Sequence, residues 1–215
     1  MQKRLGLTAC LVALLLASAT AAAPVRSVHK NVLSSDRAPQ IKIKVDDRFH
    51  YLGSFHFNIR DVAEGDRFVW VDAGRDQRVR RLVIVQLEGF LEGKGKYNYK
   101  PHNLTHLGEN DYNSNGFFYD DTAYEKENPG NEATKTRKFL EERGYKFNAE
   151  QGLYRFYRSL PDDFRNEILI FYIEDMQTLG LKMSAMTEEQ ETPREKELVA
   201  AMRERALKAF KIVAH

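Results

Sequence analysis

The sequence predicts an α+β protein, in which a curved, mainly antiparallel sheet of about six or seven strands packs against a long C-terminal helix. Two observations lead to this prediction: successive strand patterns are joined by short connections, and an amphipathic helical pattern ends the chain. One or two short helices are expected as an insertion between the strands. The chain has 215 residues, of which 42% are hydrophobic and 30% are charged, a composition typical of globular proteins.

The N-terminus has the pattern of a secretory signal peptide over residues 1–23. Basic residues come first, an apolar stretch follows, and small residues precede Pro24. We expect cleavage near Ala21–Ala23 and export to the periplasm or the cell exterior. Two alternatives stay open: residues 5–23 approach the length of an uncleaved membrane anchor, and Cys10 lies in a lipoprotein-like context, although the apolar core follows it.

Cleavage would leave a neutral chain without cysteine. It would remove Lys3 and Arg4, two of 33 basic residues, and none of the 31 acidic residues. Loss of Cys10, the only cysteine, excludes thiol catalysis and disulfides from the mature protein. A neutral balance also argues against a nucleic-acid partner, and no later stretch is apolar for long enough to cross a membrane.

The mature chain is expected to be a flexible leader, residues 24–40, followed by one globular domain, residues 41–215. Residues 41–45 alternate between apolar and polar side chains, as does the longer segment 49–59. Gly53 in the second segment indicates a bend or bulge. The residues expected to share one face of this strand are Phe49, Tyr51, Phe55, Phe57 and Ile59.

The next strands are separated by turn sequences. Residues 63–66 are expected to turn before a strand at 68–71, and residues 73–77 turn again. The run 81–87 is apolar at nearly every position, which predicts a central strand. Residues 97–99 are a further short strand candidate.

A polar segment then interrupts the strands. Residues 100–118 are rich in turn-forming residues and are expected to form a long functional loop. A short helix is predicted at 120–128, and Asn131 can cap a second helix at 132–143 that ends at Gly144.

The last part of the chain returns to strands and ends in a helix. Residues 153–158 and 167–173 are predicted strands, the second of them central. Thr192, Pro193 and Glu195 form the pattern of a helix start with a capping box. The apolar face expected for this helix consists of Val199, Met202, Ala206, Phe210 and Val213.

The long loop contains the candidate ligands for a divalent metal. Its oxygen and imidazole donors are His102, His106, Glu109 and Asp111. Their residue types suit a metal ion, but the loop lacks the spacing of a calcium-binding EF-hand. An ordinary polar loop is the alternative. No other cofactor is predicted.

Four residues are candidates for ligand binding: Glu88, Arg155, His56 and Tyr112. Glu88 follows the apolar run 81–87, and if it faces a cavity it can serve as a general acid or base. Arg155 could be an internal counter-ion in a ligand cavity. His56 lies on the polar side of its predicted strand, and Tyr112 belongs to an aromatic cluster that could line a pocket. The alternatives are strand-end solvation for Glu88, a place on the solvated face for Arg155 and His56, and ordinary core packing for Tyr112.

One further cluster is basic and could receive an anionic partner or end a hairpin in water: Arg75, Arg78, Arg80 and Arg81. No nucleophile, nucleotide-binding or zinc-protease motif occurs. The sequence therefore favours an exported, non-enzymatic ligand-binding or envelope-associated protein whose ligand is small and apolar or anionic. Two other hypotheses stay open: a metal-dependent or acid–base hydrolase that uses residues 102–111 or Glu88, and a structural protein that docks a partner.

Overall fold

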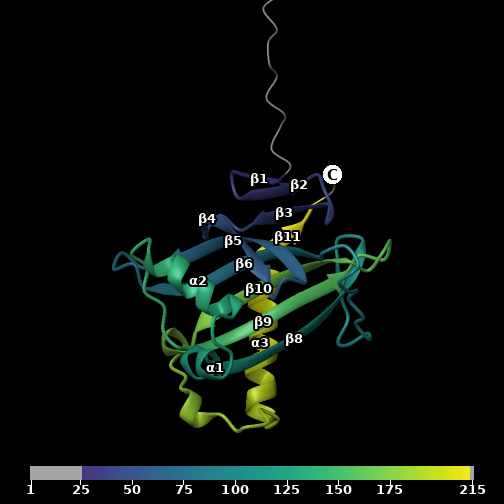
Figure 1. The fold of residues 1–215 in the computed structure, drawn as a ribbon. Helices are drawn as coiled ribbons and strands as arrows, with labels where there is room; N and C mark the ends of the chain where they lie inside the picture. Colours follow the sequence, from purple (N-terminus) through teal and green to yellow (C-terminus); the bar gives the residue numbers. More distant parts are fainter. Residues whose placement is uncertain (1–25, 214–215) are drawn as a thin grey trace, which may run out of the picture.

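The computed structural model describes residues 26–213, and this part of the chain forms two antiparallel sheets and three α-helices (Figure 1). The arrangement confirms the predicted α+β class and the antiparallel pairing of the strands. The expected signal peptide, residues 1–23, lies outside the described residues. No helix within residues 26–213 combines the length and the apolar character that are needed to cross a bilayer.

The larger sheet has seven strands in the order β4-β5-β6-β10-β9-β8-β7. In sequence order the strands are β4 (His50–Ile59), β5 (Ala63–Ala73), β6 (Val79–Phe90), β7 (Thr105–Leu107), β8 (Asn110–Asp120), β9 (Glu150–Ser159) and β10 (Asn166–Asp175). The two long apolar runs of the sequence form β6 and β10, which pair with each other inside the sheet. The prediction that these runs are central strands is confirmed.

The smaller sheet corrects the expectation of a flexible leader at residues 24–40. It has the order β1-β2-β3-β11, where β1 spans Arg26–His29, β2 spans Val32–Ser35, β3 spans Ile41–Val45 and β11 spans Phe210–Ile212. Residues 26–35 thus form a hairpin, whose turn at Lys30 and Asn31 has positive φ at both residues. The hairpin is stabilised by pairing of β2 with β3, which local sequence periodicity does not report.

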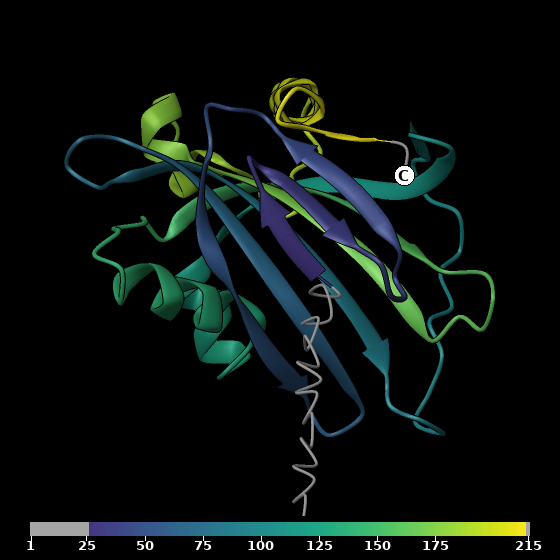
Figure 2. The same cartoon turned by 90° about the horizontal axis from the view of Figure 1, so that it is seen from above.

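The main core lies between one face of the larger sheet and two covering elements, the smaller sheet and α3 (Pro193–Leu207). Figure 2 shows the smaller sheet lying across the larger one, with α3 seen end-on beside it. Fully buried members of this core include Trp70, Phe156 and Ile170 from the larger sheet, Leu33 and Ile43 from the smaller sheet, and Met202 and Ala206 from α3.

The opposite face of the larger sheet is covered in part by a helical hairpin, α1 (Asp121–Glu127) and α2 (Glu132–Glu141). These two helices confirm the predicted insertion, and Asn131 caps α2 by accepting from the backbone of Ala133 and Thr134. Phe139 and Leu140 of α2 pack on Val69, Ile84 and other apolar residues of this second core. The cavity described below lies on this side.

The C-terminal helix begins as predicted and ends earlier than predicted. Thr192 and Glu195 form the capping box, and Pro193 is the first helical residue. The helix is only 15 residues long, because the chain leaves it after Leu207 and Phe210 pairs as a strand with Val45 of β3. The sheet is twisted rather than strongly curved (Figure 1), so the expectations of a long helix and a curved sheet are both corrected.

The predicted bulge at Gly53 is present, and it divides the aromatic face expected for β4. The register shifts by one residue between Tyr51, which pairs with Trp70, and Gly53, which pairs with Val69. Tyr51 therefore packs against the main core, whereas Phe55 packs on the other side of the sheet. The prediction of one shared face was wrong because a bulge reverses strand alternation.

Three further boundaries differ from the prediction. Residues 63–66 are the start of β5, and the turn lies earlier, at Arg60 and Asp61, where φ is positive at both residues. Residues 97–99 are not a strand. The expected loop 100–118 contains β7 and most of β8, because its polar residues find partners inside the protein: Asn113, for example, accepts a hydrogen bond from the backbone of His102.

Candidate functional site

A cavity of about 360 Å³ lies between the larger sheet and the α1–α2 hairpin. Its volume is within the range of about 300–1,000 Å³ that is common for small-molecule sites. Strand alternation determines its wall, since every second residue of β6, β9 and β10 points to this side of the sheet. Apolar members of the wall include Leu82, Ile84, Leu153, Leu169, Phe171 and Ile173.

Arg67 on β5 is the most buried cation of the wall, with 5% of its surface exposed. Its Nε donates to Gln86 Oε1 over 2.6 Å, and its Nη1 donates to Thr136 Oγ1 over 2.6 Å and to the carbonyl of Glu132 over 2.8 Å. Burial lowers the pKa of Arg67 to about 10, against the opposing effect of nearby carboxylates. These contacts tie the sheet to α2 and use the donors of Arg67 within the protein.

Gln86 connects this arginine to a pair of buried glutamates. Its amide donates to Glu88, which lies directly opposite Glu167 across the β6–β10 pair. The hydroxyl of Tyr97 donates to Glu88 over 3.1 Å, and that of Tyr99 donates to Glu167 over 2.5 Å. Burial, followed by a hydrogen bond to Glu88, raises the pKa of Glu167 to about 10. The direction of this pKa shift favours the protonated form of Glu167.

Asp121, the first residue of α1, is a second buried carboxyl group of the wall, with 3% of its surface exposed. Its Oδ2 accepts a hydrogen bond from Arg137 of α2, which also contacts Glu125 over 3.3 Å. Burial raises the pKa of Asp121, and Arg137 opposes that effect. Among the protein groups of residues 26–213, none donates to Asp121 Oδ1.

Arg155 on β9 also lines the cavity. Its Nε donates to Asn115 Oδ1 of the neighbouring strand β8 over 2.7 Å, and its guanidinium lies 5.1 Å from the ring centre of Tyr157. Within the described part of the chain, the two terminal nitrogens of Arg155 have no hydrogen-bond acceptor. They are therefore unused donors on a residue of this wall.

The cavity brings together two of the four ligand-binding residues expected from the sequence, Glu88 and Arg155. His56 lines a second, smaller cavity of about 260 Å³, which Glu88 also lines, and its Nδ1 is 2.9 Å from Asp66. Tyr112 lies on the opposite face of the sheet and is buried in the main core, where burial raises its pKa to about 12. His56 and Tyr112 are thus not part of this cavity.

The residues expected to bind a metal ion are only partly close to one another. His106 and Asp111 face each other across the β7–β8 hairpin at 2.9 Å, and both side chains are exposed. His102 instead contacts the side chain of Asn103. No group of three or more His, Cys, Asp or Glu side chains in residues 26–213 is arranged to hold a metal ion. Metal binding by this hairpin, with Glu109 as a further ligand, therefore stays a prediction without an assembled ligand set.

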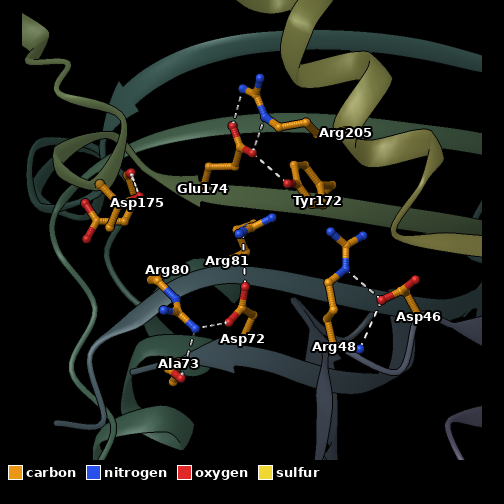
Figure 3. Close-up of polar contacts among 11 residues, drawn as sticks. Asp46, Arg48, Asp72, Ala73, Arg80, Arg81, Tyr172, Glu174, Asp175 and Arg205 are labelled. Atoms are coloured by element: carbon orange, nitrogen blue, oxygen red, sulfur yellow. Dashed lines mark hydrogen bonds and ion pairs between the residues drawn. The ribbon is translucent and has the colours of Figure 1, made fainter. Parts of the chain in front are cut away.

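Part of the predicted basic cluster is neutralised within the protein. Asp72 contacts Arg80 over 2.6 Å and Arg81 over 3.2 Å, as Figure 3 shows. Next to Arg81 on β10, Glu174 takes both the Nε and a terminal nitrogen of Arg205 at 2.6 Å, which fastens α3 to the sheet. Because Asp72 pairs with Arg80 and Arg81, this cluster has less unpaired positive charge than the sequence suggests.

Sequence reasoning missed four residues of the site region: Arg67, Gln86, Asp121 and Glu167. One signal was present, since Gln86 is a polar residue inside the continuous apolar run of β6. Such a position needs a buried hydrogen-bond partner, which strand pairing supplies as Arg67. The others depend on strand register, which the sequence does not specify.

The structure is thus an α+β protein with a cavity of mixed apolar and polar lining beside an antiparallel sheet. No family model, no curated protein and no solved structure matches the chain.

Proposed function

We propose that this chain is an exported, non-enzymatic protein that binds a small amphipathic molecule in the cavity between the larger sheet and the α1–α2 hairpin. The observation that carries the proposal is the cavity itself: about 360 Å³ of space with an apolar wall and a few buried polar groups. Close packing is the rule in protein interiors, so space of this size in a small domain favours a ligand.

Arg155 is the group we assign to the acidic head of the ligand. Arg67 donates to Gln86, Thr136 and the carbonyl of Glu132, so we assign it a structural role. Arg155 donates a hydrogen bond to Asn115 only through its Nε. A guanidinium with two unused terminal nitrogens presents the planar fork that matches a carboxylate. The apolar body of the ligand would then lie on the wall formed by β6, β9 and β10.

The test is displacement of a fluorescent fatty acid, dansyl-labelled undecanoic acid, by unlabelled dodecanoate. We expect saturable binding by the full chain and weakening by about ten-fold or more in Leu153→Trp, since the larger ring fills the cavity. The matched control is Leu104→Trp, whose site is 54% exposed and outside the cavity. Arg155→Gln should weaken dodecanoate but not dodecanol, which carries no charge. Absence of binding, or equal binding by Leu153→Trp, would refute the proposal.

Export is a separate part of the proposal and rests on the pattern of residues 1–23. Expression of the full chain in a bacterial host, followed by cell fractionation and N-terminal sequencing, tests it. We expect a periplasmic or secreted product that starts near Ala21–Ala23. A product that retains residue 1 in the cytoplasmic fraction would contradict export without affecting the cavity.

An acid–base hydrolase is the second candidate, and the observation in its favour is the pair of buried glutamates, Glu88 and Glu167, which lie opposite each other on β6 and β10. We rank it below binding because Glu167 is not part of the cavity wall and its carboxyl group is engaged by Tyr99. A panel of chromogenic esters and glycosides should give no turnover that Glu88→Gln abolishes. Turnover that this substitution abolishes would reverse the ranking.

A further inference from the structure

We infer that the tip of the α1–α2 hairpin, residues 122–135, is a lid that opens to admit the ligand, and that Arg67 holds this lid closed. The inference rests on the proposed function, because it names the route by which a molecule enters the cavity. The motion required is an outward movement of the tip while both ends of the hairpin keep their contacts with the rest of the protein.

The first observation is that the tip covers the cavity but is not itself buried. Four of its residues form part of the cavity wall: Tyr124, Asn131, Glu132 and Ala133. None of the residues 122–135 is buried, whereas the second half of α2 buries Phe139 and Leu140 in the second core. Segments with few buried apolar side chains have the lowest local stability, so the tip should open before the rest of the hairpin does.

The second observation is that both ends of the hairpin are fastened beside the strands. At the start of α1, the backbone N–H of Asp121 donates to the carbonyl of Ala149, next to β9, over 2.9 Å. Beyond α2, the backbone N–H of Lys146 donates to the carbonyl of Gln77, in the turn between β5 and β6, over 3.0 Å. These contacts keep the ends of the hairpin in place when the tip moves.

The third observation is that one buried cation of the sheet reaches the first turn of α2. Arg67 Nη1 donates to Thr136 Oγ1 over 2.6 Å and to the carbonyl of Glu132 over 2.8 Å. A further contact, from Lys135 Nζ to the carbonyl of Asn58 on β4, is longer, at 3.4 Å. Hydrogen bonds from a buried charged donor are stronger than those between neutral groups, so we assign the closure of the lid to Arg67.

The test measures how often the cavity wall becomes accessible in the ligand-free protein. In a Cys10→Ser background, which removes the only cysteine of the chain, Ile84→Cys places one thiol in the wall at a position that is 2% exposed. We expect addition of Thr136→Val to accelerate the reaction of this thiol with dithiobis(nitrobenzoate) by about five-fold or more, because the hydroxyl that accepts from Arg67 is lost.

Two matched controls separate opening of the lid from general damage. Thr134→Val removes another hydroxyl of α2, which is buried and has no hydrogen-bond partner among the described residues, so it should not accelerate the reaction. Val83→Cys places the thiol on the opposite face of β6, in the main core, where Thr136→Val should have no effect. Acceleration in either control to the same degree, or an unchanged rate at the wall thiol, would overturn the inference.

The kinetics of dodecanoate binding distinguish failure of the lid from failure of the proposed function. With displacement followed by stopped flow, Thr136→Val should raise the association and dissociation rates by a similar factor and leave the dissociation constant unchanged within about two-fold. A changed dissociation constant with an unchanged association rate would assign Thr136 to ligand contact and overturn the lid. A faster thiol reaction in a protein that does not bind dodecanoate would support opening of the tip and overturn the proposed ligand.

Discussion

At the scale of single residues, the cavity side of the sheet shows how ionisable groups are accommodated in a buried layer. Arg67 and Glu88 are joined through the side-chain amide of Gln86, which accepts from Arg67 and donates to Glu88. Glu167 lies directly opposite Glu88, and burial raises its pKa, which favours its protonated form.

The raised pKa of Glu167 predicts a stability that falls as the pH rises. Its ordinary value is 4.5 and its value in the folded protein is about 10, so between these limits the folded state holds a proton that the unfolded chain releases. By linkage, this contribution is complete below about pH 4.5 and is lost progressively toward about pH 10. Glutamine can replace the protonated acid, since its amide can donate to Glu88 and its carbonyl can accept from Tyr99.

We therefore expect the melting temperature of Glu167→Gln to exceed that of the unmodified protein by a few degrees at about pH 8.5, and the gap to shrink at about pH 5. Thermal unfolding across this range measures it. Glu109→Gln, an exchange at an exposed position, is the control and should leave the profile unchanged. Parallel profiles for Glu167→Gln and the unmodified chain would show that Glu167 is ionised in the folded state.

At the scale of elements, local signals predicted what local interactions stabilise. The capped start of α2 at Asn131, the capping box of α3 and the alternation of β3 were all found where the sequence placed them. Elements that need a remote partner were missed, such as the hairpin β1–β2 and the strand β11, because their hydrogen bonds come from residues far along the chain. Residues 100–118 were predicted to be a loop because they are rich in turn-forming residues, although β7 and most of β8 lie in this segment.

The bulge in β4 gives a prediction at this scale. Gly53 has φ of +134°, a conformation that side-chain-bearing residues rarely adopt, and an added Cβ would lie 3.3 Å from the ring of Phe139. We expect Gly53→Ala to lower the free energy of unfolding by about 1–3 kcal/mol. Urea unfolding measures it.

Gly93→Ala is the control for this substitution. Gly93 also has positive φ, at 72°, but no atom lies within 4 Å of its added Cβ. Its cost should be smaller, about 1 kcal/mol. A smaller loss at Gly53 than at Gly93 would mean that the bulge relaxes without a glycine, and that the two-sided packing of β4 does not depend on it.

At the scale of the whole molecule, the sequence could predict only those site residues whose position follows from the pattern of a single strand. Glu88 and Arg155 could be named because each lies in or next to a clear strand pattern. Their meeting in one cavity, together with Asp121, depends on the order β6-β10-β9-β8 and on the helical hairpin that crosses it. No local pattern specifies that order. The same reason explains why His56 and Tyr112, chosen for their side-chain chemistry, lie outside the cavity.

The two faces of the larger sheet have separate tasks in this fold, and Leu33 tests that separation. Leu33 lies in β2, is 0% exposed and belongs to the main core, on the face away from the cavity. Leu33→Ala should lower the free energy of unfolding by about 2–5 kcal/mol, as expected for a buried leucine. Leu104→Ala, at a position that is 54% exposed, should change it by less than about 0.5 kcal/mol.

Because the core of Leu33 and the cavity lie on opposite faces, folded Leu33→Ala protein should bind dodecanoate as the unmodified chain does. A negligible loss of stability in Leu33→Ala would mean that residues 26–35 contribute little to the folded core. A loss of dodecanoate binding in the same variant would mean that the two faces of the sheet are coupled.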